Sequence, residues 1–316
     1  MSLPSRMMLI TALVLTTLTS SSCVFAARMA YREATRAQAR QELDQGEAED
    51  RVAQNLPPDT RIARDVAYGS DAKQRFDVYM PRQVKNAPVI FMVHGGGWAH
   101  GDKTMSRVVE NKAKHWLPQG YVFISINNRL LPQATVEQQA QDVAQALAYA
   151  QAHAAEWGAD ASKFVLMGHS AGAHLIALVA SSPTLVAQAG AKPWLGSVIL
   201  DSAAYDVGEI MRGRHFPLYD HAFGSDPARW RALSPLDVLT RATPPLLSVC
   251  SSQRAKSCAQ ARTYVDKASG FGTRAAVLPQ DLSHSEINAT LGAAGAYTDA
   301  VDAFLRSLGL PAPPAR

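Results

Sequence analysis

The segment Gly168-His169-Ser170-Ala171-Gly172 constrains the fold of this 316-residue chain more than any other feature. It lies between an apolar run, Phe164–Met167, and an alanine-rich stretch with helical spacing, Ala173–Ala180. A G-x-S-x-G sequence between a buried strand and a helix is typical of a nucleophile elbow, a turn so tight that its glycines leave no room for larger residues. The turn lifts the serine hydroxyl above the sheet at the amino end of a helix, where developing negative charge is favoured. The pattern predicts Ser170 as a nucleophile.

Strands and helices alternate along the rest of the chain. Apolar or alternating runs predict strands at Arg75–Met80, Val89–Val93, Tyr121–Ile126, Phe164–Met167, Ser197–Leu200, Pro245–Val249 and Ala275–Leu278. Helical spacing predicts helices at Val136–His153, Ala173–Ala180 and Tyr297–Leu308. This order predicts an α/β fold whose mostly parallel central sheet is flanked by helices. Residues 207–230 break the rhythm with Gly, His, Pro and aromatic residues, which predicts a small cap or lid over a pocket.

The first 26 residues have the pattern of a signal peptide. Arg6 precedes the short apolar stretch 7–18, and Val24-Phe25-Ala26 fits a cleavage site. We therefore expect an exported protein, periplasmic or secreted. A second interpretation is a membrane-anchored lipoprotein lipidated at Cys23, although Ser20 stands where such signals usually carry Leu. An uncleaved N-terminal helix is the third.

The mature chain divides into a leader and one domain. Residues 27–60 are rich in Ala, Arg, Gln and Glu and predict a solvated, partly helical leader, whereas residues 61–316 carry the strand and helix pattern. Cys250 and Cys258 are the two cysteines of this domain, and export would favour a disulfide between them over two buried thiols. The net charge of +4 is modest, and the basic residues are scattered without aromatic partners. This distribution argues against nucleic-acid binding.

A second glycine-rich motif follows another buried strand. In His94-Gly95-Gly96-Gly97-Trp98, glycines let backbone N–H groups point into a cavity without interference from Cβ atoms. With the amide of Ala171, those of Gly96 and Gly97 are predicted to form an oxyanion hole for acyl transfer. The alternative is an ordinary glycine-rich turn.

His284 is the candidate base among nine histidines. It lies in a loop after the last predicted strand, where the chain order Ser…acid…His places the base. His94 and His169 lie within the two motifs and are predicted to be structural, and His174 to be packed on the helix after the elbow. His215 and His221 lie in the predicted cap.

These motifs resemble those of the α/β-hydrolase esterases, in the branch of the hormone-sensitive lipases, bacterial esterase/lipase-like proteins and kynurenine formamidases. Further features shared with that branch are Ala173-His174-Leu175, Asn128-Arg129-Leu130 followed by Asp142, and Gly101-Asp102-Lys103. The resemblance extends from about Asp65 to the C-terminus. It implies an α/β-hydrolase fold for residues 61–316, a Ser-His-acid mechanism, a small ester substrate, no metal and no dissociable cofactor.

The acid departs from the family pattern. Such esterases usually carry it just after the strand before the histidine loop, where this chain reads Cys250-Ser251-Ser252-Gln253-Arg254. Asp201, which ends the apolar run 197–200, is the best substitute because a buried carboxylate must be partnered. Asp206 is the second candidate, in a Tyr-Asp pair that resembles a structural pair of the family. Asp281 is expected to shape the histidine loop, and a Ser-His dyad without an acid is the remaining alternative.

The sequence thus predicts a serine hydrolase that cleaves carboxylic esters through an acyl-enzyme, using Ser170, His284 and Asp201. Aromatic side chains predicted to line the substrate pocket, or else to pack in the core, are Trp98, Phe216, Tyr219 and Phe223. One rival is an amidase of the arylformamidase type. Another is a non-catalytic binding protein of the same fold, which Arg254 at the usual acid position favours.

Overall fold

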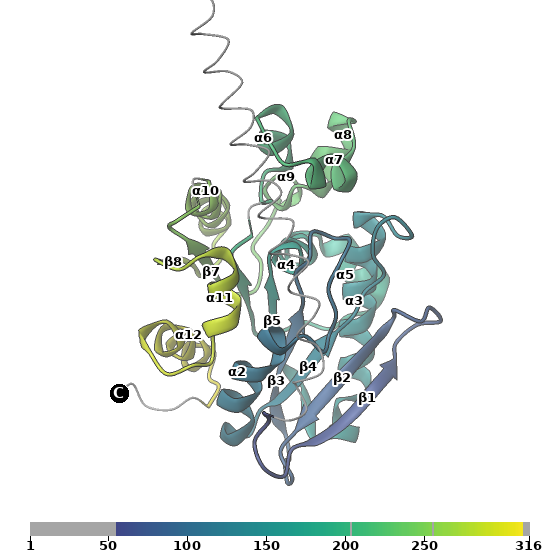
Figure 1. Cartoon of the computed structure of the whole chain (residues 1–316), viewed down its shortest axis with the longest axis vertical. Helices are drawn as coiled ribbons and strands as arrows, with labels where there is room; N and C mark the ends of the chain where they lie inside the picture. Colours follow the sequence, from purple (N-terminus) through teal and green to yellow (C-terminus); the bar gives the residue numbers. More distant parts are fainter. Residues whose placement is uncertain (1–54, 203, 255, 312–316) are drawn as a thin grey trace, which may run out of the picture. The chain divides into compact units, whose positions relative to one another are not determined.

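The structure is a computed structural model that describes residues 55–202, 204–254 and 256–311 (Figure 1). The predicted signal peptide 1–26, with Cys23, lies outside the described residues, as does most of the leader 27–60. The predicted single domain from residue 61 therefore contains nearly everything described below.

Eight strands form one sheet in the order β1-β2-β4-β3-β5-β6-β7-β8. Their bounds are β1 Arg61–Ala67, β2 Arg75–Met80, β3 Ala87–Val93, β4 Val122–Ile126, β5 Ala159–His169, β6 Gly196–Leu200, β7 Leu246–Ser251 and β8 Ala275–Gln280. The pairings β1–β2 and β2–β4 are antiparallel, and every pairing from β4 to β8 is parallel. The predicted mostly parallel sheet is confirmed. The apolar pattern does not predict β1, because this edge strand has no buried side chain.

Helices cover both faces of the sheet, and each face carries its own apolar cluster. One cluster includes side chains of α3 (Val136–His153), α4 (Ala171–Ser181) and α10 (Ser257–Gly270). The other includes side chains of α2 (Ser106–Trp116) and α12 (Ala296–Ser307). Consecutive strand residues alternate between the faces, as strand geometry requires, so Ile199 joins the first cluster while Val198 and Leu200 join the second. Figure 1 shows α2 and α12 on one side of the sheet, with α3 and α5 (Pro183–Ala189) on the other.

Four short helices replace the expected cap loop between β6 and β7. They are α6 Val207–Arg212, α7 Pro217–Phe223, α8 Pro227–Leu233 and α9 Pro235–Val238, and they lie together beyond one end of the sheet (Figure 1). Within the described residues, no single helix is long and apolar enough to cross a bilayer, and only α4 and α5, taken together across a 91° bend, pass that test of length and composition.

The strand register places the site. His169 pairs with Leu200 on the neighbouring strand, and Leu200 pairs with Val249 on the next. The amide of Ser170 donates to the carbonyl of Leu200 at 3.0 Å, and that of Asp201 donates to the carbonyl of Val249 at 2.8 Å. Ser170 and Asp201 therefore occupy corresponding positions at the carboxyl ends of adjacent parallel strands, the edge where open α/β sheets bind ligands.

Candidate active site

Ser170 lies in a strained turn directly before α4. Its φ of 54° and ψ of −115° fall outside the regions that non-glycine residues prefer. The turn leaves its side chain half-exposed at the amino end of the helix. Strained backbone of this kind is characteristic of functional sites. The helix begins at Ala171, two residues before the predicted start, because the elbow serine is itself the N-cap position.

The glycines of the elbow are required by close approach. A Cβ atom on Gly172 would lie 2.4 Å from the carbonyl oxygens of both Val93 and His94, and one on Gly168 would lie 2.5 Å from the carbonyl oxygen of Gly172. These neighbours are backbone atoms, which cannot move aside as a flexible side chain does.

Gly172→Ala is therefore expected to lower the free energy of unfolding by about 3 kcal/mol, the upper part of the range for forced overpacking. The matched control is Gly270→Ala at the end of α10, where the new methyl group would meet nothing within 4 Å. The control is expected to change stability by less than about 1 kcal/mol. Urea unfolding followed by circular dichroism measures both. Equal stabilities of the two variants would contradict this account of the elbow.

The structure brings Ser170, His284 and Asp201 into one hydrogen-bonded chain. The Ser170 hydroxyl donates to His284 Nε2 over 2.9 Å, and His284 Nδ1 donates to Asp201 Oδ2 over 2.5 Å. His284 is the first residue of α11 (His284–Thr290), whose capping box at Ser283 fixes the helix start. This is the geometry of nucleophile, base and orienting acid.

The two other carboxylate candidates lie in different surroundings. Asp206 is the N-cap of α6, and its Oδ1 accepts from the amide of Glu209 at 2.7 Å. Asp281 is exposed and accepts from the Gln253 side chain at 3.1 Å. Neither contacts His284 within the described part of the chain, which leaves Asp201 as the carboxylate that reaches the imidazole.

Asp201 is fully buried and saturated with donors. Oδ1 accepts from the amide of Ser251 at 2.8 Å and from the hydroxyl of Ser257, while Oδ2 accepts from His284 and from Arg254 Nη1 at 2.8 Å. Burial alone would raise the pKa of this carboxyl, but the hydrogen bond from His284 and the charge of Arg254 reverse the effect and hold the pKa far below its usual range. Asp201 is therefore ionised throughout the neutral range.

His284 has a pKa below its ordinary value of 6.5. Burial of the ring is the largest cause, and the positive charge of Arg254 adds to it, against the raising effect of Asp201. A base must be neutral to accept a proton, so a lowered pKa extends its working range toward acid.

We accordingly expect the acid limb of kcat/KM for ester hydrolysis to have its midpoint below pH 6.5. Activity is full above that midpoint and is lost as the pH falls through the folded-state pKa of His284. A pH series with a short-chain p-nitrophenyl ester, read at the isosbestic wavelength, measures the midpoint. A midpoint above 6.5 would contradict the assignment of His284 in this environment.

The predicted oxyanion amides lie open. Within the described residues, the backbone N–H groups of Gly96, Gly97 and Ala171 donate to no protein acceptor. Gly96 and Gly97 have φ values of 119° and 58°, which orient the loop next to the elbow. Uncommitted backbone donors beside a nucleophile can bind an oxyanion.

Two histidines do more than the sequence predicts. His169 Nε2 donates to the carbonyl of His284 at 2.9 Å, and the two rings lie 4.5 Å apart, so His169 fixes the backbone of the candidate base. His174 Nδ1 accepts from the indole of Trp98 at 3.2 Å, and its Nε2 donates to the Leu233 carbonyl at 2.8 Å. Burial lowers the pKa of His174 to about 4, which keeps it neutral in that tautomer. The sequence signal for both roles was only their place beside the elbow.

Three of the four aromatic candidates are in contact with one another, Trp98 from the glycine-rich loop and Tyr219 and Phe223 from α7 of the cap. The ring of Trp98 lies 4.9 Å from that of Phe223 and 5.8 Å from that of Tyr219. Phe223 and Trp98 are both buried, with 0% and 4% of their surface exposed, whereas Tyr219 and Phe216 are half-buried. The pocket role of the four side chains stays a prediction, and the packing alternative suits the buried Trp98 and Phe223 better than the half-buried Tyr219 and Phe216.

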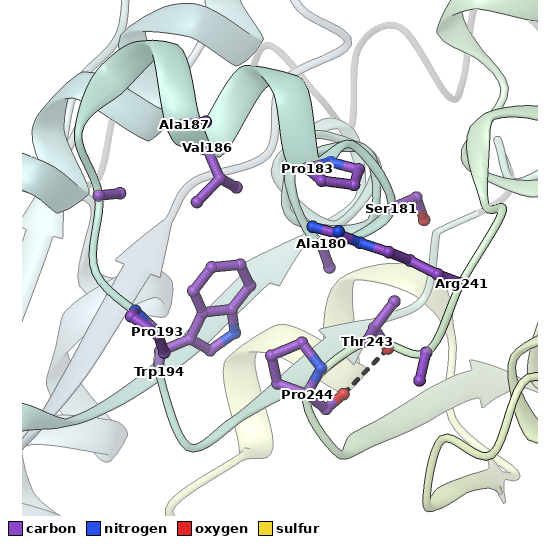
Figure 2. Close-up of a pocket in the computed structure, with 12 residues that line it drawn as sticks. Ala180, Ser181, Pro183, Val186, Ala187, Pro193, Trp194, Arg241, Thr243 and Pro244 are labelled. Carbon is purple, nitrogen blue, oxygen red and sulfur yellow. Dashed lines mark hydrogen bonds between the residues drawn. The ribbon is translucent and has the colours of Figure 1, made fainter.

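A separate cavity of about 310 Å³ lies away from this edge (Figure 2). Its walls come from the end of α4, from α5, and from the segments before β6 and β7, with Trp194, Arg241 and Pro244 prominent in the view. Because these segments precede the strands, the cavity lies at their amino ends. The 11 residues of α4, about 16 Å at helical rise, separate it from Ser170. It is not the pocket for a group that reacts at Ser170.

The described residues include no cluster of three His, Cys, Asp or Glu side chains arranged to hold a metal ion. They do include the predicted disulfide, between Cys250 and Cys258, with Cα atoms 5.1 Å apart.

Comparison of the sequence with known proteins finds esterases. The sequence model of the BD-FAE family matches residues 76–190. Esterase LipC of Mycobacterium tuberculosis is 30% identical over 225 residues, which are 65% of this chain and 54% of LipC. A probable isoprenylcysteine alpha-carbonyl methylesterase of Oryza sativa subsp. japonica is 30% identical over 118 residues, 37% of this chain and 28% of that protein. The chain thus spans about half the length of LipC and less of the rice protein.

Comparison of the structure finds the same architecture. Esterase B of Lactobacillus rhamnosis, inhibited by a tributyrin phosphonate, has a TM-score of 0.69 at 22% identity and covers 88% of this chain and 95% of its own. Esterase 2 of Thermogutta terrifontis has a TM-score of 0.65 at 21% identity and covers 83% and 99%. At these identities the likeness is one of fold.

Proposed function

We propose that this chain is an esterase/lipase-like α/β-hydrolase and that it hydrolyses carboxylic esters with Ser170 as nucleophile, an assignment that the matching family model and the related esterases support. The observation that carries the proposal is the continuous hydrogen-bonded chain Ser170–His284–Asp201, at 2.9 and 2.5 Å, beside three uncommitted backbone amides. Relatives named as esterases support the type of reaction.

The reaction proceeds by acyl transfer in two halves. His284 Nε2 takes the hydroxyl proton as Ser170 Oγ attacks the ester carbonyl, and the oxyanion accepts hydrogen bonds from the amides of Gly96, Gly97 and Ala171. Asp201 keeps the Nδ1 proton of His284 in place and stabilises the imidazolium. His284 then protonates the leaving alcohol, which breaks the ester C–O bond and leaves an acyl group on Ser170. A water molecule, deprotonated by His284, repeats the sequence and releases the acid.

Labelling by a fluorophosphonate tests the proposal independently of the natural substrate. We expect intact-mass analysis to show one adduct per chain, and peptide mapping to place it on Ser170. Turnover of p-nitrophenyl acetate and butyrate should accompany labelling. Neither labelling nor turnover by a folded protein would favour the non-catalytic binding protein. Faster cleavage of N-formylkynurenine than of aryl esters would favour the arylformamidase-type amidase.

We also propose that the protein is exported, either periplasmic or secreted, or anchored through a lipidated Cys23. The signal pattern of residues 1–26 supports export, and a disulfide between Cys250 and Cys258 suits an oxidising compartment. Mass spectrometry of the mature protein distinguishes a chain that begins near Ala27 from one that begins with diacylated Cys23. An unprocessed N-terminus would contradict both.

A further inference from the structure

The disulfide closes a short loop that lies against the candidate acid. Cys250 is the penultimate residue of β7, and Cys258 lies in the first turn of α10. Both cysteines are buried. Since β6 and β7 are neighbours, this loop lies directly beside the residue that follows β6, which is Asp201.

Three of the four donors to Asp201 come from inside this loop. They are the amide of Ser251, the hydroxyl of Ser257 and the guanidinium of Arg254, and the fourth is His284 itself. Ser251 and Ser257 adjoin the two cysteines in the chain, so the disulfide fixes their spacing. A carboxylate has about four lone-pair sites, and here every one has a donor.

The same loop contacts the segment that leads to the candidate base. The hydroxyl of Ser251 donates to the Leu282 carbonyl at 2.6 Å, and the amide of Ser252 donates to the Gln280 carbonyl at 2.9 Å. Gln253 adds its side-chain bond to Asp281. The loop thus joins the end of β6 to the end of β8 and sets the position of the acid relative to the base.

Arg254 adds a charge as well as a hydrogen bond. Its Nη1 lies 2.8 Å from Asp201 Oδ2 and 3.1 Å from His284 Nδ1. With its proton directed at Asp201, His284 Nδ1 has no free lone pair to accept a hydrogen bond from the guanidinium. The contact between Arg254 and the ring is therefore one of like charge whenever the imidazole is protonated. The contact disfavours the imidazolium, and it lowers the pKa of His284.

Other charged groups near His284 are placed differently. His169 faces the ring from the end of β5 and is held neutral by burial, which lowers its pKa well below normal. Lys112 on α2 is buried and donates to the carbonyls of Arg107 and Asn288, the latter in the last part of α11. Glu286 caps the start of α11 and is exposed. Arg254 is therefore the cation in contact with the imidazole within the described chain.

We propose that the disulfide-closed loop Cys250–Cys258 positions the relocated acid, and that Arg254 both anchors Asp201 and sets the acid limit of the enzyme's pH range. The inference rests on the esterase function proposed above. Arg254 is a positioning residue, because it acts on the reaction through Asp201 and His284. Just after β7, where the sequence resemblance implies an acid, this chain carries Arg254, which holds an acid from the adjacent strand.

The first test is the pH profile of Arg254→Gln. Loss of the cation raises the pKa of His284, so the acid limb of kcat/KM should move upward by about one pH unit. Arg254→Lys should bring the midpoint of the acid limb most of the way back to its wild-type pH, since lysine restores the positive charge but not the planar guanidinium. The matched control is Arg129→Gln, which removes an arginine of similar exposure, 28% against 26%, from another fully buried aspartate, Asp142. The control should lower the melting temperature and leave the limb in place. An unmoved limb in Arg254→Gln would overturn the role of Arg254.

The second test removes the disulfide. In Cys250→Ala/Cys258→Ala, kcat should fall by about ten- to a hundredfold with little change in KM, because small misplacements of catalytic groups have effects of that size. Assays are run well below each variant's melting temperature, and a cooperative transition shows that the variant folds. An unchanged kcat would overturn the positioning role of the loop. If the double variant does not fold, treatment of the folded wild type with a membrane-impermeant phosphine, followed by the same assay, gives the same comparison.

A proton NMR measurement separates this inference from the proposed function. The Nδ1 proton of a histidine bonded to a buried carboxylate resonates far downfield, whether or not the protein turns over an ester. We expect that resonance in the wild type and its shift or loss in Arg254→Gln and in the disulfide variant. A wild type that shows the resonance but neither turnover nor fluorophosphonate labelling would contradict the esterase function. It would still support the role of the loop in positioning Asp201. Resonances identical in all three proteins would overturn the inference alone.

Discussion

Ser170→Ala is expected to lower kcat for p-nitrophenyl butyrate by about a million-fold, to a residual rate supported by binding and the oxyanion amides alone. The alanine side chain has no oxygen to attack the carbonyl, and His284 Nε2 loses the hydrogen bond now at 2.9 Å. The methyl group fits within the space of the hydroxymethyl group, so the strained turn and the melting temperature should be nearly unchanged. Stopped-flow or long-incubation assays, with mass spectrometry to exclude contaminating wild type, measure the residual rate.

The control for this variant is Ser307→Ala. Ser307 is exposed at the end of α12, and its hydroxyl donates to the carbonyl of Phe304 in its own helix. It should keep full activity and full fluorophosphonate labelling. Labelling of the Ser170→Ala protein at wild-type stoichiometry would mean that another residue is the nucleophile, and the proposed mechanism would be wrong.

Asp201→Asn is expected to lower kcat by about ten-thousandfold. The asparagine side chain replaces one acceptor oxygen by an NH2 group, which donates. The imidazole is then no longer held in the tautomer that leaves Nε2 free to accept from Ser170. The substitution also leaves Arg254 beside the imidazole without the carboxylate that offsets its charge, at 3.1 Å from Nδ1. Both effects oppose the imidazolium that forms during attack.

Asp206→Asn is the matched control for the acid. Asparagine caps a helix about as well as aspartate, so α6 should keep its start and the enzyme its activity. If Asp206→Asn lost activity and Asp201→Asn did not, the acid would lie in the cap. If kcat of both variants remained within about tenfold of the wild-type value, a Ser-His dyad would be the better description of the site.

Sequence features with a local physical cause led to correct predictions about the fold. The elbow follows from a turn in which Gly168 and Gly172 meet backbone atoms, and the buried strands follow from unbroken apolar runs. The exposed edge strand β1 lacks such a run, and the cap residues form four short helices where a loop was expected. The observed ends of helices differ from the predicted ends by a few residues, as at Ala171, because caps and turns determine where a helix begins.

Contacts between distant segments were harder to predict. Asp201 could be selected because a carboxylate that ends a buried strand needs a partner, but nothing local indicated that Ser251 and Ser257 would supply its other donors. Arg254 favoured a non-catalytic binding protein when the sequence was considered alone. In the structure its guanidinium binds the carboxylate that reaches His284, so the same residue supports the triad geometry.

The row formed by Ser170, Asp201 and Cys250 at the ends of three adjacent strands has a consequence for design and for divergence. A carboxylate can approach the same imidazole from the end of β6 or from the loop after β7, while the nucleophile and the base stay where they are. The acid is therefore the member of the triad that the strand order leaves open to exchange between β6 and β7. A lineage that moved its acid from one strand to the next would keep the elbow, the glycine-rich loop and the imidazole.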